Sequence, residues 1–543
     1  MTTRAPQIPG LQLLSALASA SRTVVAQAFQ PVRQRPTTAR TRARKPETMK
    51  EHPGGVERRW GVWALARFCA PWVSNAGEKE KNALPKEHKT LSLRGFGAPN
   101  SGWLAAKAFF SFSPGSWLRC KKRAKAHTPR RAAVPGFPID VPPGGNYRKV
   151  FFLVAALPAL AALATAAGRG SPWPLHTIDN SSRGADGVRL ADVNGDGLLD
   201  ITTGWEEGGV VRVYLNPGPK RAKERWPAVT VGKVRSVEDA VFADLDADGA
   251  TDVVSCCEGR TRTVFVHWAP KNGLDPSAWR TEAFPALQGK AMWMFALPLQ
   301  VDGKNGIDLV VGAKGGGARI GWLEAPANPR NLADWKWHPL YDAGWIMSLI
   351  ALDLDGDGDL DILASDRKGR NRGCLWLENP GPGETSDWKE HRIGKGDREV
   401  MFITTCDLDR DGLGDVLAAT RGYELVLYRR TAAKPPAWEA HVIKLPPNTG
   451  TGKAVAVADI NLDGKHDIVF TCEHARGKSG VVWLSYRRSP LEPDWEPHEI
   501  SGPKGTKYDL VVPIDLDADG DLDVLTCEEA ENLGVIWYEN PTR

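Results

Sequence analysis

The sequence lacks the short motifs that identify many enzyme classes. Its 543 residues contain no nucleophile elbow, no H-E-x-x-H zinc motif, no phosphate-binding glycine loop and no C-x-x-C-H haem-attachment motif. Cysteine is scarce as well, because the chain has 8 and no two of them form a C-x-x-C pair. No catalytic class can be assigned from such motifs, and we lean towards a protein that is not an enzyme.

The first part of the chain has few acidic residues. Residues 1–147 hold 25 Lys and Arg against 7 Asp and Glu, whereas residues 148–543 hold 45 against 58, so the net charge of +5 describes neither part. Residues 1–146 show no sustained hydrophobic period, which predicts a basic segment of low order. A basic arm could bind nucleic acid or anionic lipid. The segment that follows it argues against a nucleic-acid partner.

Residues 147–168 resemble a secretion signal. Arg148 and Lys149 precede an apolar run over 150–163, and Ala164 to Ala166 form an A-x-A cleavage site. Because such signals belong at a chain start, residues 1–146 are interpreted as a mis-assigned start. The alternative is a membrane anchor over the barely sufficient apolar run. Pro158 and the small-residue end favour cleavage, and either interpretation predicts an extracytoplasmic protein.

A short acidic loop, D-x-[DN]-x-D-G-x-x-D, recurs at intervals of 52 to 56 residues and is followed each time by β-branched apolar residues. Such a period indicates one supersecondary unit per repeat. Oxygen ligands at positions 1, 3, 5 and 9, with a glycine at position 6, suit Ca²⁺. The predicted calcium ligands are Asp192, Asn194, Asp196 and Asp200; Asp244, Asp246, Asp248 and Asp252; Asp353, Asp355, Asp357 and Asp361; Asp407, Asp409, Asp411 and Asp415; Asp459, Asn461, Asp463 and Asp467; and Asp515, Asp517, Asp519 and Asp523.

The copy between the second and fourth loops is degraded. It reads Gln300, Asp302, Lys304 and Asp308, with Asn305 in place of the glycine. We expect this loop to be free of metal, with the Lys304 ammonium between Asp302 and Asp308 as a built-in cation. For all seven loops, the plainer alternative is an Asp- and Gly-rich turn without metal.

The loops are not EF-hands. Position 12 lacks the bidentate glutamate of that motif, and the flanking segments read as strands, such as 362–364 and 524–526. Each repeat contains four short strands, the fourth opening with Trp, which is the pattern of a propeller blade. The seven Trp strands begin at Trp173, Trp226, Trp279, Trp335, Trp388, Trp438 and Trp495. The sequence predicts an all-β, seven-bladed propeller over 171–543, with the Trp173 strand completing the last blade.

The acidic loops and their number and spacing resemble the FG-GAP/VCBS-like repeat family, which includes the head of integrin alpha subunits and many exported bacterial proteins. The resemblance covers about residues 171–543. It implies a seven-bladed propeller with Ca²⁺ in loops on one rim.

Repeat-equivalent cysteines and histidines are expected to be structural. Cys256 and Cys527, and likewise Cys257 and Cys472, follow their loops at equal offsets, so they lie in different blades and predict packing thiols rather than disulfides. Five histidines lie three residues after a strand tryptophan, where a ring keeps them apart: His176, His338, His391, His441 and His498. We expect them to pack on outer strands.

Function is expected where the repeats differ, at the starts of the inner strands and the ends of the second strands. These positions should border the axial channel: Asp186, Glu238, Trp293, Trp345, Glu399, Lys453 and Tyr508, with Glu206, Glu258, Lys314, Asp366, Arg421, Glu473 and Glu528. They suit a sugar or a peptide, although solvated loop residues are the simpler alternative.

Two functions follow. We favour a monomeric, non-catalytic binding scaffold for a protein or glycan, with membrane contact only through an N-terminal anchor. The alternative is a secreted polysaccharide lyase or hydrolase that uses channel carboxylates such as Glu258 and Glu473 with Lys314, Arg421 or Lys453.

Overall fold

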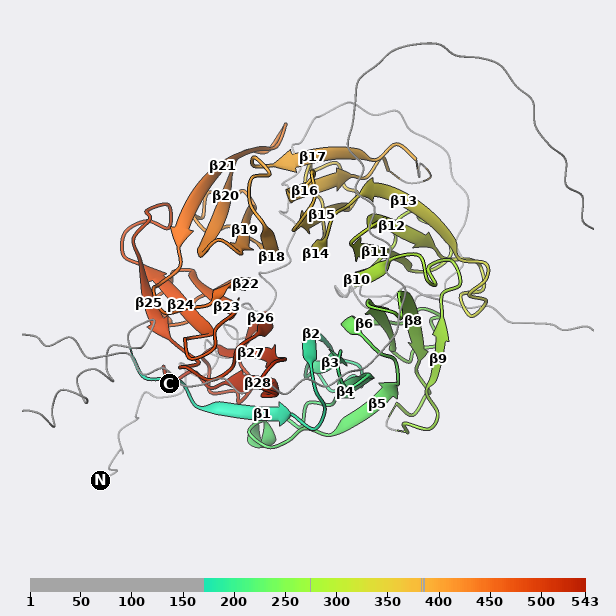
Figure 1. Ribbon diagram of the computed structural model, residues 1–543, viewed down its shortest axis with the longest axis horizontal. Coiled ribbons are helices and arrows are strands. Elements are labelled where there is room, and N and C mark those ends of the chain that lie inside the picture. Colours follow the sequence, from blue (N-terminus) through green and yellow to red (C-terminus); the bar gives the residue numbers. More distant parts are fainter. Residues whose placement is uncertain (1–169, 274, 382, 384–385) are drawn as a thin grey trace, which may run out of the picture. The chain divides into compact units, whose positions relative to one another are not determined.

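The computed structural model describes residues 170–543, except 274, 382 and 384–385. The predicted segments 1–146 and 147–168 lie outside the described residues. Within the described chain, 28 strands form seven four-stranded antiparallel sheets. The sheets are arranged as the blades of a ring (Figure 1). The prediction of a seven-bladed, all-β propeller is confirmed.

Each blade runs outward from the central axis in strand order. The inner strands are β2 (Ala185–Ala191), β6 (Val237–Ala243), β10 (Met292–Leu299), β14 (Ile346–Leu352), β18 (Val400–Cys406), β22 (Thr451–Ala458) and β26 (Tyr508–Ile514). The second strands are β3 (Asp200–Trp205), β7 (Asp252–Cys257), β11 (Asp308–Lys314), β15 (Asp361–Asp366), β19 (Asp415–Thr420), β23 (Asp467–Glu473) and β27 (Asp523–Glu528).

The outer half of each blade completes the sheet. The third strands are β4 (Val210–Tyr214), β8 (Thr263–Trp268), β12 (Arg319–Glu324), β16 (Gly373–Glu378), β20 (Glu424–Ala432), β24 (Val481–Tyr486) and β28 (Gly534–Tyr538). The fourth are β1 (Leu175–Asp179), β5 (Ala228–Gly232), β9 (Arg280–Ala283), β13 (Lys336–Asp342), β17 (Lys389–Ile393), β21 (Ala437–Lys444) and β25 (Trp495–Glu499). A short 3-10 turn, Pro219–Arg221, lies between β4 and β5.

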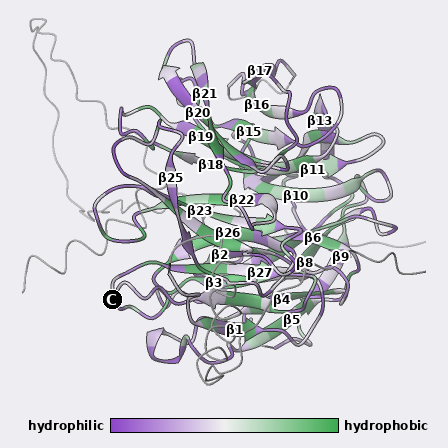
Figure 2. Ribbon diagram, turned by 60° about the vertical axis from the view of Figure 1, so that its left-hand side comes forward, coloured by the Kyte–Doolittle hydropathy of each residue, from purple (hydrophilic) through white to green (hydrophobic). Residues whose placement is uncertain are grey.

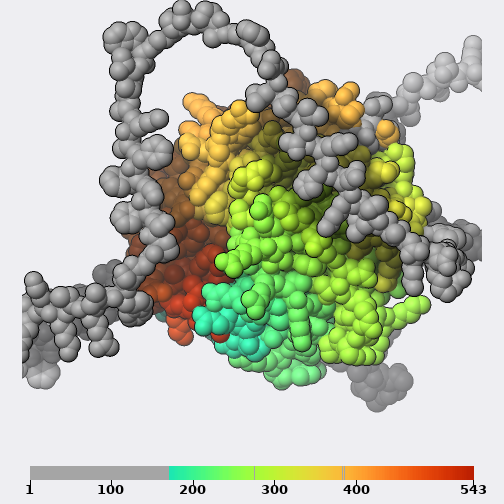
Figure 3. All heavy atoms as spheres, turned by 45° about the vertical axis from the view of Figure 1, so that its right-hand side comes forward, coloured from blue at the N-terminus to red at the C-terminus, as the bar shows by residue number. Residues whose placement is uncertain are grey.

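The ends of the ring meet in one sheet. Strand β1 pairs antiparallel with β28, in the order β1-β28-β27-β26, and Leu175 lies opposite Tyr538. The start of the described chain therefore lies against its C-terminal segment (Figure 3). This confirms the predicted seam, which pairs the outer edge of β28.

The core lies between neighbouring blades. Every residue of the second strands β3, β7, β11, β15, β19, β23 and β27 is buried. Apolar residues concentrate along the strands and polar residues in the connecting loops (Figure 2). Strands buried on both faces read as continuous apolar runs, which is what the sequence shows after each acidic loop.

The tryptophan at the expected start of the fourth strand lies before that strand in five blades. There the ladder begins one or two residues later, for example at Leu175 rather than Trp173 and at Lys389 rather than Trp388. Trp173 is 8% exposed and Trp335 is 3% exposed. These side chains therefore pack in the space beside the blade. From sequence periodicity alone, such a buried tryptophan is predicted to be part of the strand.

Four repeat histidines pack on a tryptophan of the adjacent third strand. The rings of Trp376 and His391 stack at 4.2 Å, and His391 Nε2 lies 2.6 Å from Glu378 Oε2. The same ring contact joins His176 to Trp537, His338 to Trp322 and His498 to Trp483. All six cysteines of the described chain are free. The structural assignment of these histidines and cysteines is confirmed.

No helix in the described part of the chain is long and apolar enough to cross a membrane.

Candidate functional site

The acidic loops connect the inner strand of each blade to its second strand. Their sixth residue has a positive φ in every copy, 87° at Gly197 and 107° at Gly358, and 52° at Asn305 in the degraded copy. Glycine adopts this conformation without strain and asparagine tolerates it. The loops of all seven blades therefore share a left-handed residue at this position.

Carboxylates converge in at least three of the full loops. In each of three sets, oxygens lie within 4.8 Å of one another: Asp244, Asp246 and Asp248; Asp353, Asp355 and Asp357; Asp407, Asp409 and Asp415. Asp244 Oδ1, Asp407 Oδ1 and Asp517 Oδ1 are buried and have no hydrogen-bond partner in the described chain. Closely packed carboxylates repel one another, and a buried oxygen without a partner is costly. This donor set fits a hard cation that accepts oxygen ligands.

The aspartate at position 9 also holds the blade together. Asp361 Oδ2 accepts the N–H of Leu354 at 2.8 Å, and its Oδ1 accepts the N–H of Asn379, after the third strand, at 2.9 Å. Asp308 in the degraded loop makes the equivalent two bonds, to Val301 and Ala325. From the sequence this aspartate was predicted only as a metal ligand. Its second role, accepting backbone N–H groups that hold the blade together, could not be recognised, because aspartate suits both roles.

Burial raises the pKa of every position-9 aspartate. The values are about 6 for Asp200 and Asp415, about 7 for Asp308, Asp361, Asp467 and Asp523, and about 8 for Asp252. Backbone N–H donors oppose the effect of burial.

In the degraded loop, protein groups take the contacts that a cation would make. Gln300 Nε2 donates to the backbone carbonyls of Lys304, at 2.8 Å, and Gly306. Gly306 occupies position 7, whose carbonyl is the expected backbone ligand. The Lys304 ammonium pairs with Asp302 at 3.0 Å and makes no ion pair with Asp308 in the described chain. The expected placement of Lys304 between both carboxylates is therefore wrong, because backbone N–H groups engage Asp308.

Basic side chains from elsewhere reach three of the full loops. Arg330 pairs with Asp246, Arg429 with Asp409 and Asp411, and Lys223 with Asp517. The sequence did not signal these contacts. Arg330 lies 84 residues from Asp246 and comes from the next blade, whereas Arg429 comes from the third strand of the same blade as Asp409. They neutralise part of the loop charge.

The opposite ends of the inner and second strands meet around the axis. Ion pairs there connect different blades: Lys314 with Glu238 and Glu258, Arg367 with Glu399 and Glu473, Arg421 with Glu473, and Lys453 with Asp509. Arg421 also pairs with Glu399 within its own blade. In Figure 1 the strands that carry them surround the centre of the ring. Most of the expected residues therefore lie in contact with one another at this end of the ring, and Arg367 and Asp509 are members that the sequence did not single out.

Trp345 is the aromatic centre of this end of the channel. Lys314 Nζ, Arg367 Cζ and Lys368 Nζ lie 4.6, 4.5 and 4.6 Å from its ring centroid. Attraction of cations to a tryptophan face is worth about 0.5–2 kcal/mol. The ring therefore holds three cations at the channel mouth.

Two of the predicted channel residues organise loops instead. Asp366 accepts the N–H groups of Gly344 and Trp345, and Glu528 accepts five backbone N–H groups around it. Both are fully buried. These carboxylates shape the channel loops rather than face a ligand.

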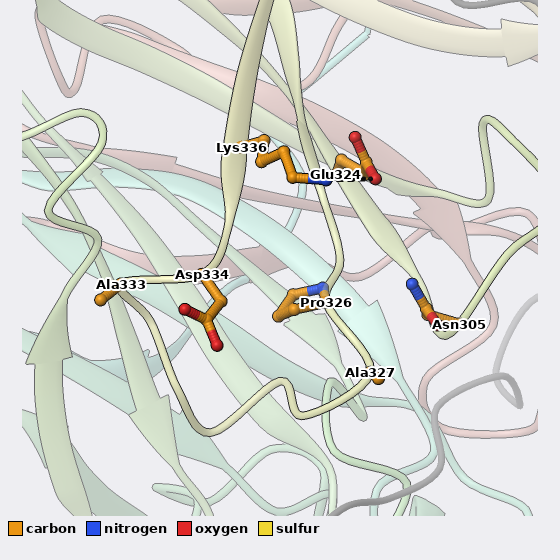
Figure 4. A pocket seen from close by; sticks show the side chains of 7 residues that line it. All are labelled: Asn305, Glu324, Pro326, Ala327, Ala333, Asp334 and Lys336. Atoms are coloured by element: carbon orange, nitrogen blue, oxygen red, sulfur yellow. Dashed lines mark hydrogen bonds and ion pairs between the residues drawn. The ribbon is translucent and has the colours of Figure 1, made fainter.

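Two open pockets lie on the described surface. One, about 480 Å³, adjoins the degraded loop and is lined by Asn305, Glu324, Pro326, Ala327, Ala333, Asp334 and Lys336 (Figure 4). Lys336 pairs with Glu324 at its edge. The other, about 440 Å³, is lined by Asp397, Arg398, Glu399, Thr420, Arg421, Gly422 and Glu424. It contains two of the predicted channel residues, Glu399 and Arg421.

A comparison with protein families agrees with this architecture. The family model of the FG-GAP-like repeat matches residues 192–255 and 407–470. Each match begins at an acidic loop, includes the acidic loop of the following blade and ends in the second strand of that blade. No curated protein matches the sequence. A solved structure, "Crystal structure of BBS1N in complex with ARL6DN, soaked with lead", is similar at 12% identity and a TM-score of 0.42, over 68% of this chain and 98% of that chain.

Proposed function

Since the chain is a β-propeller built from FG-GAP-like repeats, a fold that supports binding scaffolds in general, we propose that it is an exported, calcium-stabilised scaffold. It binds a protein or a glycan at the channel mouth and acts as a monomer. The convergence of carboxylates in the acidic loops is the observation that carries this proposal.

Calcium would be held by the six full loops, through the carboxylates and Asn side chains at positions 1, 3, 5 and 9. The ion supplies positive charge at the point where the inner strand turns into the second strand. There it offsets repulsion among side chains such as Asp353, Asp355 and Asp357, whose oxygens lie within 4.8 Å. Because extracytoplasmic spaces hold enough free calcium to fill weak loop sites, export and calcium binding are consistent.

The ligand site is proposed at the channel mouth because charge and an aromatic face meet there. Trp345 lies beside three cations, and the pocket with Glu399 and Arg421 adds both charge signs. Aromatic faces with hydrogen-bonding groups suit sugars and peptides. The alternative lyase or hydrolase requires a carboxylate ready to accept a proton. The structure instead pairs Glu258 with Lys314, and Glu473 with Arg421 at 3.5 Å, which favours binding.

Thermal unfolding of the full chain in Ca²⁺ and in chelator tests the calcium part. A ligand at hundredfold excess over its Kd stabilises by about 2.7 kcal/mol per site. The double variant Asp355→Asn, Asp357→Asn should lose part of the calcium-dependent rise in Tm. The matched control Asp302→Asn, in the degraded loop, should keep the whole rise. An identical melting curve with and without chelator contradicts calcium binding.

A glycan array and a screen of uronate-containing polymers test the ligand part. We expect retention of a ligand without its cleavage, and weaker binding by Trp345→Ala than by the exposed-site variant Tyr423→Ala. Cleavage of any polymer, lost in Arg421→Ala, would establish the enzyme instead.

A further inference from the structure

A second group of carboxylates lies on the axis, at the ends of the strands opposite the acidic loops. Asp186 lies in β2 of the first blade. Asp509 lies in β26 of the last blade, and Glu529 directly follows β27 of the same blade. One oxygen of each lies within 4.8 Å of the others. Asp186 belongs to a second such trio with Glu206 and Glu238 of the first and second blades. The two trios form a continuous acidic wall across three blades.

The first trio is removed from solvent, whereas Glu206 and Glu238 of the second are partly buried. Asp509 is 1% exposed, Asp186 is 5% exposed and Glu529 is 9% exposed. The acidic loops, called rim loops from here on, are more exposed, since most of their position-5 carboxylates, such as Asp196, lie in contact with solvent. A buried carboxylate needs a counter-charge or a full set of hydrogen bonds, because desolvation of an unpaired charge costs several kcal/mol.

The lysines around the wall leave it short of positive charge. Lys453 pairs with Asp509 at 2.8 Å, Lys507 pairs with Glu529, and Lys314 pairs with Glu238 and Glu258. Three ammonium groups thus face six carboxyl groups, of which Asp186 and Glu206 form no ion pair in the described chain. Burial raises the pKa of Asp186 well above its usual range, which shows how strongly this place disfavours an unpaired negative charge. Nearby arginines do not close the gap, since Arg189 pairs with Asp239.

A separate observation marks a missing partner. Glu529 Oε2 is bonded to Lys507, but Glu529 Oε1 is buried and has no hydrogen-bond partner in the described chain. Its carboxyl group belongs to the trio with Asp186 and Asp509. A buried acceptor oxygen without a donor is costly, and more so when the group is charged.

We propose that a divalent cation binds on the propeller axis, held by Asp186, Asp509 and Glu529. All donors are carboxylate oxygens without His or Cys, which selects a hard ion such as Ca²⁺, Mg²⁺ or Mn²⁺. The ion reduces the charge excess and gives Glu529 Oε1 a partner. It also joins the inner strand of the first blade, β2, to that of the last, β26.

Anomalous diffraction from crystals of the full chain grown with Mn²⁺ locates the ion directly. We expect a peak at bonding distance from Asp186, and its absence in Asp186→Asn crystals in which other Mn²⁺ peaks persist. No axial peak at saturating Mn²⁺ overturns the proposal, whatever the rim loops bind. An axial peak with empty rim loops supports it and instead contradicts calcium in the loops.

Equilibrium dialysis with Mn²⁺ gives the count in solution. Asp186→Asn and Glu529→Gln should each bind one ion fewer than the wild type, and the exposed Glu207→Gln should bind the same number. Glu529→Gln retains a neutral side chain of the same size, so it tests the site if Asp186→Asn does not fold. Equal counts in wild type and Glu529→Gln overturn the proposal.

Discussion

The two roles of the position-9 aspartate, acceptor of backbone hydrogen bonds and metal ligand, can be measured separately by comparing two blades. Asp308, in the loop expected to be metal-free, and Asp361, in a full loop, each accept two backbone N–H groups. Replacement by alanine leaves both donors without a partner in a buried place, at about 1–3 kcal/mol each. Asp308→Ala and Asp361→Ala should therefore each lower the free energy of unfolding by about 2–6 kcal/mol.

Calcium distinguishes the two variants. Denaturant unfolding in chelator should give similar losses for both. In calcium at hundredfold excess, the loss in Asp361→Ala should grow by as much as about 2.7 kcal/mol, because its loop also loses a ligand, whereas the loss in Asp308→Ala should not change. The exposed Glu390→Ala is the control, with an expected effect within about 0.5 kcal/mol. The reasoning is refuted if Asp308→Ala matches Glu390→Ala, or if its loss depends on calcium.

Four further predictions follow from the same contacts. In the Asp186→Asn variant, which lacks the axial site, calorimetric titration should count six calcium ions per chain, and adding Gln300→Asp, Lys304→Asp and Asn305→Gly should raise the count by one; an unchanged count contradicts the account of this loop. Burial raises the pKa of Asp308 to about 7, so its contribution to stability is fully present below about pH 4 and is lost as pH rises through 7. In chelator, the free energy of unfolding of the wild type minus that of Asp308→Asn should therefore fall between about pH 4 and pH 7. A rise over this range would contradict the argument. Deleting residues 1–182 removes β1 and leaves the β28 edge unpaired, so size-exclusion chromatography should show association or aggregation; a stable monomer would show that the seam is dispensable. His391→Ala, which loses the ring stack on Trp376, should cost about 1 kcal/mol in denaturant unfolding, more than His441→Ala, which has no ring stack in the described chain; equal costs would reject the stacking role.

The architecture could be predicted because its signals are local and repeated. The acidic loop, the apolar strand after it and the tryptophan recur in every blade, so seven weak signals reinforce one another, and the unpaired first strand then requires the seam with β28. The exact strand starts were missed where Trp173 or Trp388 packs beside the blade, because a buried aromatic residue gives the same sequence signal in either place.

The channel was harder to predict, because its contacts join distant segments. Lys314 and Glu238 are 76 residues apart, and no periodicity relates them, since each belongs to a position where the repeats differ. Sequence placed these residues near the axis through the blade pattern, but not their pairing. Pairing depends on which side chains from neighbouring blades have the length and charge to meet.

The degraded loop shows which parts of the repeat serve the fold and which serve a metal. It keeps Asp308 and a residue that tolerates a positive φ, Asn305, but it replaces the first and third carboxylates with Gln300 and Lys304. The retained features bond to backbone in every blade, whereas the replaced carboxylates are those whose counterparts crowd together in other loops, where Asp244 Oδ1 and Asp407 Oδ1 have no donor. The first aspartates of the full loops also accept backbone N–H groups, as Asp192 does from Gly195 and Gly197, so they serve the loop fold as well. Gln300 differs in that its Nε2 donates to the carbonyls of Lys304 and Gly306. A carboxylate cannot make such a contact, so in the other six loops the position-7 carbonyl is left for a cation, which is the argument for metal there.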